Sequence, residues 1–163
     1  MNKQCLKLFT TLSLLLCTIY SVQAQQLIVK NAYIRATIPG TNVSSAYMVL
    51  QNKTDSAITL TGVTGDFSDR IEIHEHVMTD SMMSMRQRET LVINAQSEVE
   101  LQPYGYHLMI FNIVKPLIAN EKAMVTLQFS QGQPQTIELP ITSIKQNIKK
   151  NTQSKSNHQH HHH

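Results

Sequence analysis

The chain has 163 residues, of which 41% are hydrophobic and 15% charged, and its formal net charge is +3 at pH 7. This length suits one folded domain. The weak net charge gives no sign of a nucleic-acid binder. The carboxylates are scattered and no Ser/His/Asp arrangement has motif support, so we also expect no enzyme.

The N-terminus has the pattern of an export signal. Lys3 and Lys7 precede a mostly apolar run over residues 8–19, and Ala24 ends a V-Q-A sequence that resembles a cleavage site. This pattern predicts a signal peptide over residues 1–24, cleaved after Ala24, and a periplasmic mature protein. The apolar run is well short of the ~20 residues that a spanning helix needs. We therefore expect no membrane span once the signal is removed.

Removal of the signal would also remove every cysteine. Cys5 and Cys17 are the only two in the protein, so the mature chain would have no disulfide, no thiolate ligand and no cysteine nucleophile. A lipid anchor at Cys17 would require a small residue before it, and Leu16 occupies that position. We therefore expect a periplasmic domain without a lipid anchor.

The body of the chain, residues 25–144, has the pattern of a series of short strands. Each segment carries alternating β-branched or aromatic residues, and Gly, Pro, Asn and Asp separate the segments. A brief helical turn is expected only at residues 66–70. The pattern predicts an all-β sandwich or barrel of short, mostly antiparallel strands. The predicted strands are 26–34, 46–51, 57–63, 71–77, 83–88, 98–101, 106–113, 123–129 and 135–141.

Methionine and histidine gather in two segments of this body. Outside the C-terminal tail, every histidine lies in one of the two. Residues i and i+2 of a strand project from one face, roughly 7 Å apart, so neighbouring strands would surround one point with imidazoles and thioethers. This geometry does not choose among the methionines at 82, 83 and 85. The two sets are His74, His76, Met78, Met82, Met83 and Met85, then His107 and Met109.

The residue types of these two segments favour one metal. Thioethers are soft and neutral and imidazole is borderline, so a mixed set suits Cu(I) better than zinc, calcium or magnesium. A blue-copper site would need a cysteine sulfur. The competing interpretation is an Ig-like interaction module without metal, in which the methionines pack or form a soft surface. For Glu72 and Glu75 we favour a solvated strand face over a role in orienting imidazoles.

The C-terminal segment, residues 145–163, is polar and lacks aromatic residues, so we expect a disordered tail. It ends in a histidine run that Gln159 interrupts. An expression tag would explain such a run, but the interruption and the retained export signal favour a native metal-gathering tail. Its histidines are His158, His160, His161, His162 and His163.

The spacing of four residues resembles that of a known family. His74, Met85, His107 and Met109 match H-x10-M-x21-H-x-M, the signature of the PCu(A)C family of periplasmic copper chaperones. The sequence around these residues is similar too, and the resemblance covers residues 29–141. There are departures, because Tyr104 stands where a glycine is expected before the second ligand block, and Phe111-Asn112 replaces a frequent Met-Gly.

The resemblance implies a cupredoxin-like β-sandwich that holds one Cu(I) near its surface with those four residues. It also implies delivery of copper to a copper-accepting protein of oxidase assembly, either a cytochrome c oxidase subunit or another copper chaperone. A periplasmic copper buffer or tolerance protein would use the same site. The tail histidines would bind copper as Cu(II). An outer ring of auxiliary ligands would capture the metal or hand it over, formed by His76, Met78, Met82 and Met83.

Overall fold

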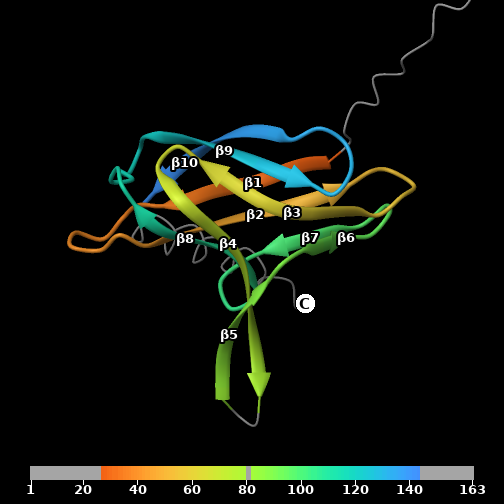
Figure 1. Cartoon of the computed structure of the whole chain (residues 1–163), viewed down its shortest axis with the longest axis horizontal. Coiled ribbons are helices and arrows are strands. Elements are labelled where there is room, and N and C mark those ends of the chain that lie inside the picture. The colour runs from red at the N-terminus through yellow and green to blue at the C-terminus, as the bar shows by residue number, and fades with distance from the viewer. Residues whose placement is uncertain (1–26, 80–81, 144–163) are drawn as a thin grey trace, which may run out of the picture.

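The computed structural model of the chain describes residues 27–79 and 82–143 and contains ten β-strands there (Figure 1). Within those ranges no helix is long and apolar enough to cross a membrane. The predicted signal peptide, its cleavage after Ala24 and the histidine tail lie outside the described residues. The strands are β1 Leu27–Arg35, β2 Ser44–Asn52, β3 Ile58–Gly65, β4 Ser68–Thr79, β5 Met82–Arg88, β6 Leu91–Ile93, β7 Glu98–Leu101, β8 Tyr106–Ile113, β9 Lys122–Phe129 and β10 Gln135–Thr142.

The strands form one continuous sheet that closes on itself. Their order is β5-β4-β8-β7-β2-β1-β10-β9-β3-β6, and two further pairings join β4 to β3 and β8 to β2. The β3–β4 pairing closes a barrel-like ring, from which β5 and β6 extend at its two margins. Two pairings, β1 with β10 and β7 with β8, are parallel, and the others are antiparallel. The all-β fold of mostly antiparallel strands is therefore confirmed.

Alternation along the strands decides which residues face the core. Ala46 of β2 lies opposite Leu108 of β8, and both are buried. Directly opposed residues of an antiparallel pair share a face, so this face is the inside of the barrel. The residues on either side of Leu108, His107 and Met109, consequently belong to the outer face. The sequence period of two thus separates core-forming residues from the candidate ligands.

Asn52 is the main polar anchor inside this fold. Its side chain is fully buried, and its amide nitrogen donates to the carbonyl oxygens of Ser56, Ile93 and Asn94 at 2.8–3.1 Å. Its amide oxygen accepts from the backbone N–H and the hydroxyl of Thr54. One side chain therefore ties the end of β2, the β2–β3 turn and the end of β6 together.

The nine predicted strands are confirmed, and most of their ends are shifted by one to three residues. β6 was not predicted, because three residues are too short to show alternation. The predicted helical turn at 66–70 is wrong, since residues 66–67 form a tight turn and β4 begins at Ser68. The cause is tertiary, because Ser68 pairs with β8 opposite Ile113 and its hydroxyl donates to the carbonyl oxygen of Phe111.

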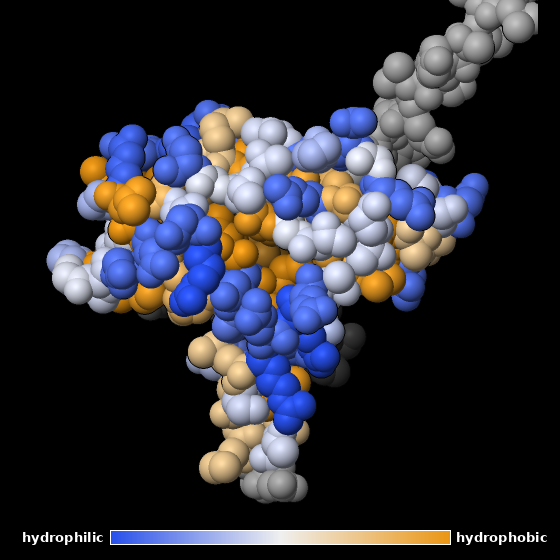
Figure 2. Space-filling view, viewed as in Figure 1, coloured by the Kyte–Doolittle hydropathy of each residue, from blue (hydrophilic) through white to orange (hydrophobic). Residues whose placement is uncertain are grey.

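The β4–β5 hairpin projects beyond the barrel (Figure 1). Pairing between β4 and β8 ends at Glu75 and Tyr106, whereas pairing between β4 and β5 continues to Thr79 and Met82. The end of β4 is thus supported by one neighbouring strand only. In Figure 2 apolar side chains line one side of the hairpin and strongly hydrophilic ones the other. In this view the hairpin therefore has an apolar margin beside a hydrophilic one.

Candidate metal site

Three adjacent strands, β5, β4 and β8, bring the predicted ligands onto one outer face. In register, His74 lies opposite His107, Glu72 opposite Met109, and His76 opposite Met85. Because opposed residues of antiparallel strands share a face, the four predicted primary ligands lie on the same side of the sheet. We call this surface the His/Met face; its members are His74, His76, Met78, Met83, Met85, His107 and Met109.

The three imidazoles lie against one another. The ring centroid of His107 is 5.0 Å from that of His76 and 5.9 Å from that of His74. Two aromatic rings that the sequence analysis did not assign to the site border these imidazoles. The ring centroid of Tyr47 lies 6.4 Å from that of His107, and the centroid of Phe111 lies 5.9 Å from that of His74. Phe111 lies two residues from Met109 on β8, so alternation was an available signal for it, whereas Tyr47 comes from β2 and no spacing along the chain pointed to it.

His107 is the innermost ligand candidate. Its side chain is only 4% exposed, although it points outward, because the neighbouring rings cover it. Its Nδ1–H donates to the carbonyl oxygen of Gly105 at 3.1 Å, which leaves Nε2 as the nitrogen with a free lone pair. Burial lowers the pKa of His107 below its usual value, and the Gly105 hydrogen bond partly opposes this shift. The ring is thus kept neutral, the form that binds metals.

His74 is held by a carboxylate. Its Nε2–H donates to Glu72 Oε2 at 2.7 Å, while its Nδ1 is buried without a hydrogen-bond partner among the described residues. Nδ1 of His76 is buried and without a partner in the same way. A carboxylate that fixes one imidazole nitrogen and leaves the other for a metal is a recurrent arrangement at metal sites. Glu72 therefore orients a candidate ligand, contrary to our expectation of a solvated position.

Glu75 takes no part in this arrangement. It lies opposite Tyr106 and Arg86, on the other face of β4. Arg88 donates to its carboxylate from Nε at 2.7 Å and from a terminal nitrogen, and these hydrogen bonds lower the pKa of Glu75. Glu75 thus belongs to a charged network on the face that turns away from the histidines.

The exposure of the methionines increases from β8 outward to the β4–β5 hairpin. Met109 is half-buried, Met85 is 53% exposed and Met78 is 72% exposed. Met83 lies opposite Met78 on the same face. Met82 lies opposite Thr79, so its side chain points to the other face. The structure therefore brings three of the four predicted auxiliary residues, His76, Met78 and Met83, to the His/Met face and separates Met82 from them.

Tyr104 forms part of the rim. It has a positive φ of 67°, the backbone conformation expected where the resembling family carries a glycine. Such a conformation is strained for a bulky residue. The ring of Tyr104 lies 5.9 Å from that of His76 and is 77% exposed. A side chain at this turn therefore borders the imidazole cluster from the solvent side.

Imidazole, thiol and carboxylate side chains alone do not form a metal site in the part of the chain that the structure describes. In residues 27–79 and 82–143 no three His, Cys, Asp or Glu side chains converge as a metal-binding group. A metal on the His/Met face would therefore need thioether sulfur among its ligands, which matches the donor set of Met85 and Met109 and favours a soft ion.

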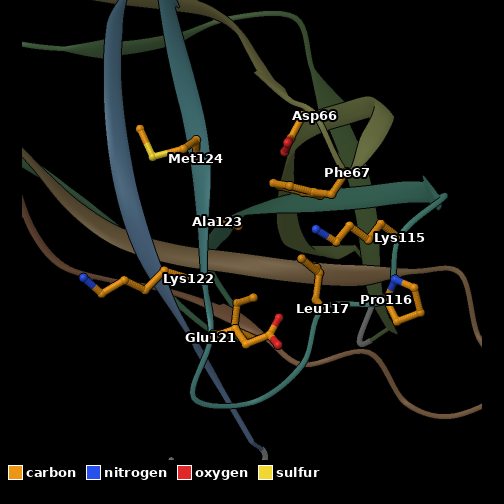
Figure 3. Close-up of a pocket in the computed structure, with 10 residues that line it drawn as sticks. Asp66, Phe67, Lys115, Pro116, Leu117, Glu121, Lys122, Ala123 and Met124 are labelled. Atoms are coloured by element: carbon orange, nitrogen blue, oxygen red, sulfur yellow. The ribbon is translucent and has the colours of Figure 1, made fainter.

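A pocket of about 130 Å³ lies elsewhere on the barrel (Figure 3). Phe67, Leu117 and Met124 line it, together with Lys115 and Glu121. It contains no histidine, and none of its lining residues belongs to the His/Met face. The concave surface and the candidate metal site are therefore separate features.

Known proteins resemble this chain in sequence. A family model described as "LpqE-like: Putative lipoprotein LpqE-like" matches residues 27–141. The protein named "Putative lipoprotein Lxx21020", from Leifsonia xyli subsp. xyli, is 28% identical over 120 residues, which are 73% of this chain and 71% of that relative.

Solved structures resemble the chain in fold. The "Copper-bound PCuAC domain from PmoF2" has a TM-score of 0.63 at 21% identity and covers 76% of this chain and 97% of its own; at that identity it supports the fold alone. "CuI-DR1885" from Deinococcus radiodurans has a TM-score of 0.61 at 26% identity and covers 76% of this chain and 83% of its own. The sequence resemblance is thereby confirmed: the chain belongs to the LpqE-like family, a family of the PCu(A)C type.

Proposed function

We propose that this chain is an exported copper chaperone that binds Cu(I) through His74, Met85, His107 and Met109. One observation carries the proposal: two facing imidazoles each keep one ring nitrogen without a hydrogen-bond partner, on the same face as two thioethers. Sulfur and neutral nitrogen ligands suit a soft monovalent ion. The copper-bound relatives of the same fold support the identity of the metal.

Different residues of the site would hold the ion and allow its release. His107 would supply Nε2 from a buried position, and Glu72 holds Nε2 of His74, which would leave Nδ1 of that ring to bind the metal. Met85 is more than half exposed, so the ligand of an acceptor can reach the ion beside it. Thioethers exchange without taking up or losing a proton, so release needs no change in protonation at sulfur.

We further propose that the acceptor is a protein of oxidase assembly, either a cytochrome c oxidase subunit or another copper chaperone. The PCu(A)C type of the chain supports this choice. Relatives named as lipoproteins support export. The tail histidines His158 and His160–His163 would gather copper as Cu(II), since imidazoles without thioethers suit the divalent ion.

Competition between the full chain and a Cu(I) chelator tests the site. We expect His107→Ala and Met109→Leu each to weaken Cu(I) binding by at least about tenfold, because each removes one ligand. Met124→Leu is the matched control, since Met124 lies on β9, outside the His/Met face, and is 48% exposed. Binding that is equal in all four proteins would refute the site.

Transfer separates a chaperone from a copper buffer. The copper-loaded chain is mixed with the metal-free copper domain of a cytochrome c oxidase subunit, and copper in each protein is measured after separation. If the chain is a chaperone, the acceptor gains copper faster from the copper-loaded chain than from a Cu(I)–chelator complex at the same buffered copper concentration. A buffer shows no such acceleration.

A further inference from the structure

We infer that the β4–β5 hairpin carries a second Cu(I) site, formed by His76, Met78 and Met83, on the solvent side of the four-ligand site. The inference rests on the proposed function for the identity of the metal, but it concerns different residues. A second site would explain why histidine and methionine side chains continue along the hairpin beyond the four residues that match the family spacing.

Strand register brings these three side chains together. Met78 lies directly opposite Met83, one residue pair outward from His76 and Met85 on the same face. Directly opposed Cβ atoms are ~5 Å apart and successive same-face residues roughly 7 Å apart. Long, unbranched thioether side chains bridge such separations easily. Two thioethers and one imidazole therefore share the outer part of the hairpin's His/Met face, within reach of one ion.

His76 has a nitrogen available for this role. Its Nδ1 is buried without a hydrogen-bond partner among the described residues. Glu72 holds His74 and the Gly105 carbonyl holds His107, whereas no hydrogen bond to His76's ring is found in that part of the chain. An imidazole nitrogen shielded from water costs free energy unless something binds it, and a metal ion satisfies it.

The methionines of the hairpin do not serve the core. Four of the eight methionines of the protein lie at positions 78–85, and all four are more than half exposed. Core packing therefore does not account for them. Arg86 and Arg88 lie on the opposite face of the hairpin, so the three proposed ligands meet no neighbouring cation in their own row.

The position of His76 links the two sites. Its ring lies 5.0 Å from that of His107, and it is opposed to Met85, both ligands of the proposed inner site. A Cu(I) ion on the hairpin would thus be one ligand exchange away from the inner site. The exposed outer site is the part of the face that an acceptor protein reaches first.

Methionine methyl resonances of the full chain report each site separately. With ¹³C-methyl methionine, anaerobic Cu(I) titration should shift Met85 and Met109 first. Met78 and Met83 should shift with a further equivalent, while Met82 stays in place because it points to the other face. If Met78 and Met83 keep their resonances while Met85 and Met109 move, the second site is refuted and the inner site stands. If only Met78 and Met83 move, the inner site is refuted instead.

Substitution gives an independent measurement. The double variant M78L/M83L should lose one equivalent of chelator-resistant Cu(I) relative to the unchanged chain, and M82L should lose none. The three methionines are similarly exposed on one hairpin, and the tail is the same in every protein. Equal stoichiometry in M78L/M83L and M82L would overturn the inference and leave the outer methionines as a soft docking surface.

Discussion

His107 shows how a single residue combines position and chemistry. Burial is the main cause of its lowered pKa, and the nearby His76, His74 and Arg35 add to the effect. In an unfolded chain the same imidazole has a pKa of about 6.5. The unfolded state therefore takes up the proton first as the pH falls. Folding stability contributed by the neutral ring is present above about pH 6.5 and is lost as the pH falls toward the folded-state pKa.

We therefore expect the copper-free chain to lose stability as the pH falls from about 7.5 to 5, and His107→Gln to lose less of it over that range. Urea unfolding at several pH values, with a metal chelator present, measures the two slopes. The histidines of the tail are the same in both proteins, so the difference between the slopes reports on residue 107 and the rings that it contacts. Parallel slopes would show that His107 is not the residue responsible.

Glu72 acts on copper only through His74. Glu72→Gln keeps the shape of the side chain but replaces the carboxylate that holds the Nε2–H by a neutral acceptor. Loss of such a supporting contact lowers metal affinity by about tenfold or more. We expect that decrease in Cu(I) competition. Glu75→Gln is the matched control on the opposite face of the same strand, and an equal effect there would contradict the assigned role.

At the scale of elements, the ends of β2 and β6 depend on Asn52. Replacing Asn52 by Ala removes the partner of three carbonyl oxygens and of the Thr54 N–H in a buried place. Unsatisfied buried groups cost about 1–3 kcal/mol each, so we expect Asn52→Ala to lower the free energy of unfolding by about 3 kcal/mol or more.

Chemical denaturation measures this loss. Asn94→Ala is the control, because the Asn94 side chain is exposed and only its backbone carbonyl serves the network. Its effect should stay within about 0.5 kcal/mol. A similar loss in both variants would show that the Asn52 network is not what joins these strands.

The hairpin is the second element whose geometry has consequences. Its alternation puts Met78, Met83 and Met85 on one side and Met82 on the other. The four methionines look equivalent in the sequence, because they are close together and of one type. Cross-strand register alone distinguishes them, and it depends on where the chain turns between β4 and β5.

At the scale of the whole molecule, the proposed inner site joins three strands. Its ligands come from β4, β5 and β8, which meet only in the folded barrel. A ligand that binds only the folded state raises the free energy of unfolding by about 2.7 kcal/mol when its concentration is 100 times the dissociation constant. We expect anaerobic Cu(I) to stabilise the chain by an amount of this order.

Thermal unfolding with and without Cu(I) measures that stabilisation. His107→Ala should show at most about half of it, since a tenfold weaker affinity leaves about 1.4 kcal/mol. Met124→Leu should show all of it, because Met124 lies outside the His/Met face. An equal increase in midpoint temperature in H107A would mean that the ion acts elsewhere in the chain.

The sequence by itself determined the all-β class, nine of the ten described strands and the inward or outward direction of residues such as Leu108 and His107. Its two-residue period and its turn residues are local properties, readable without knowing what lies beside each strand. The four-residue spacing indicated the family in the same way, because it is a pattern along the chain.

Only the tertiary structure decided which strands are neighbours. It placed His74 opposite His107, gave Glu72 to His74 and Glu75 to Arg88, and turned Met82 away from the other methionines. It also formed β6 and began β4 at Ser68, where local sequence suggested otherwise. Pairing between strands depends on residues far apart in the chain, so no local period contains it.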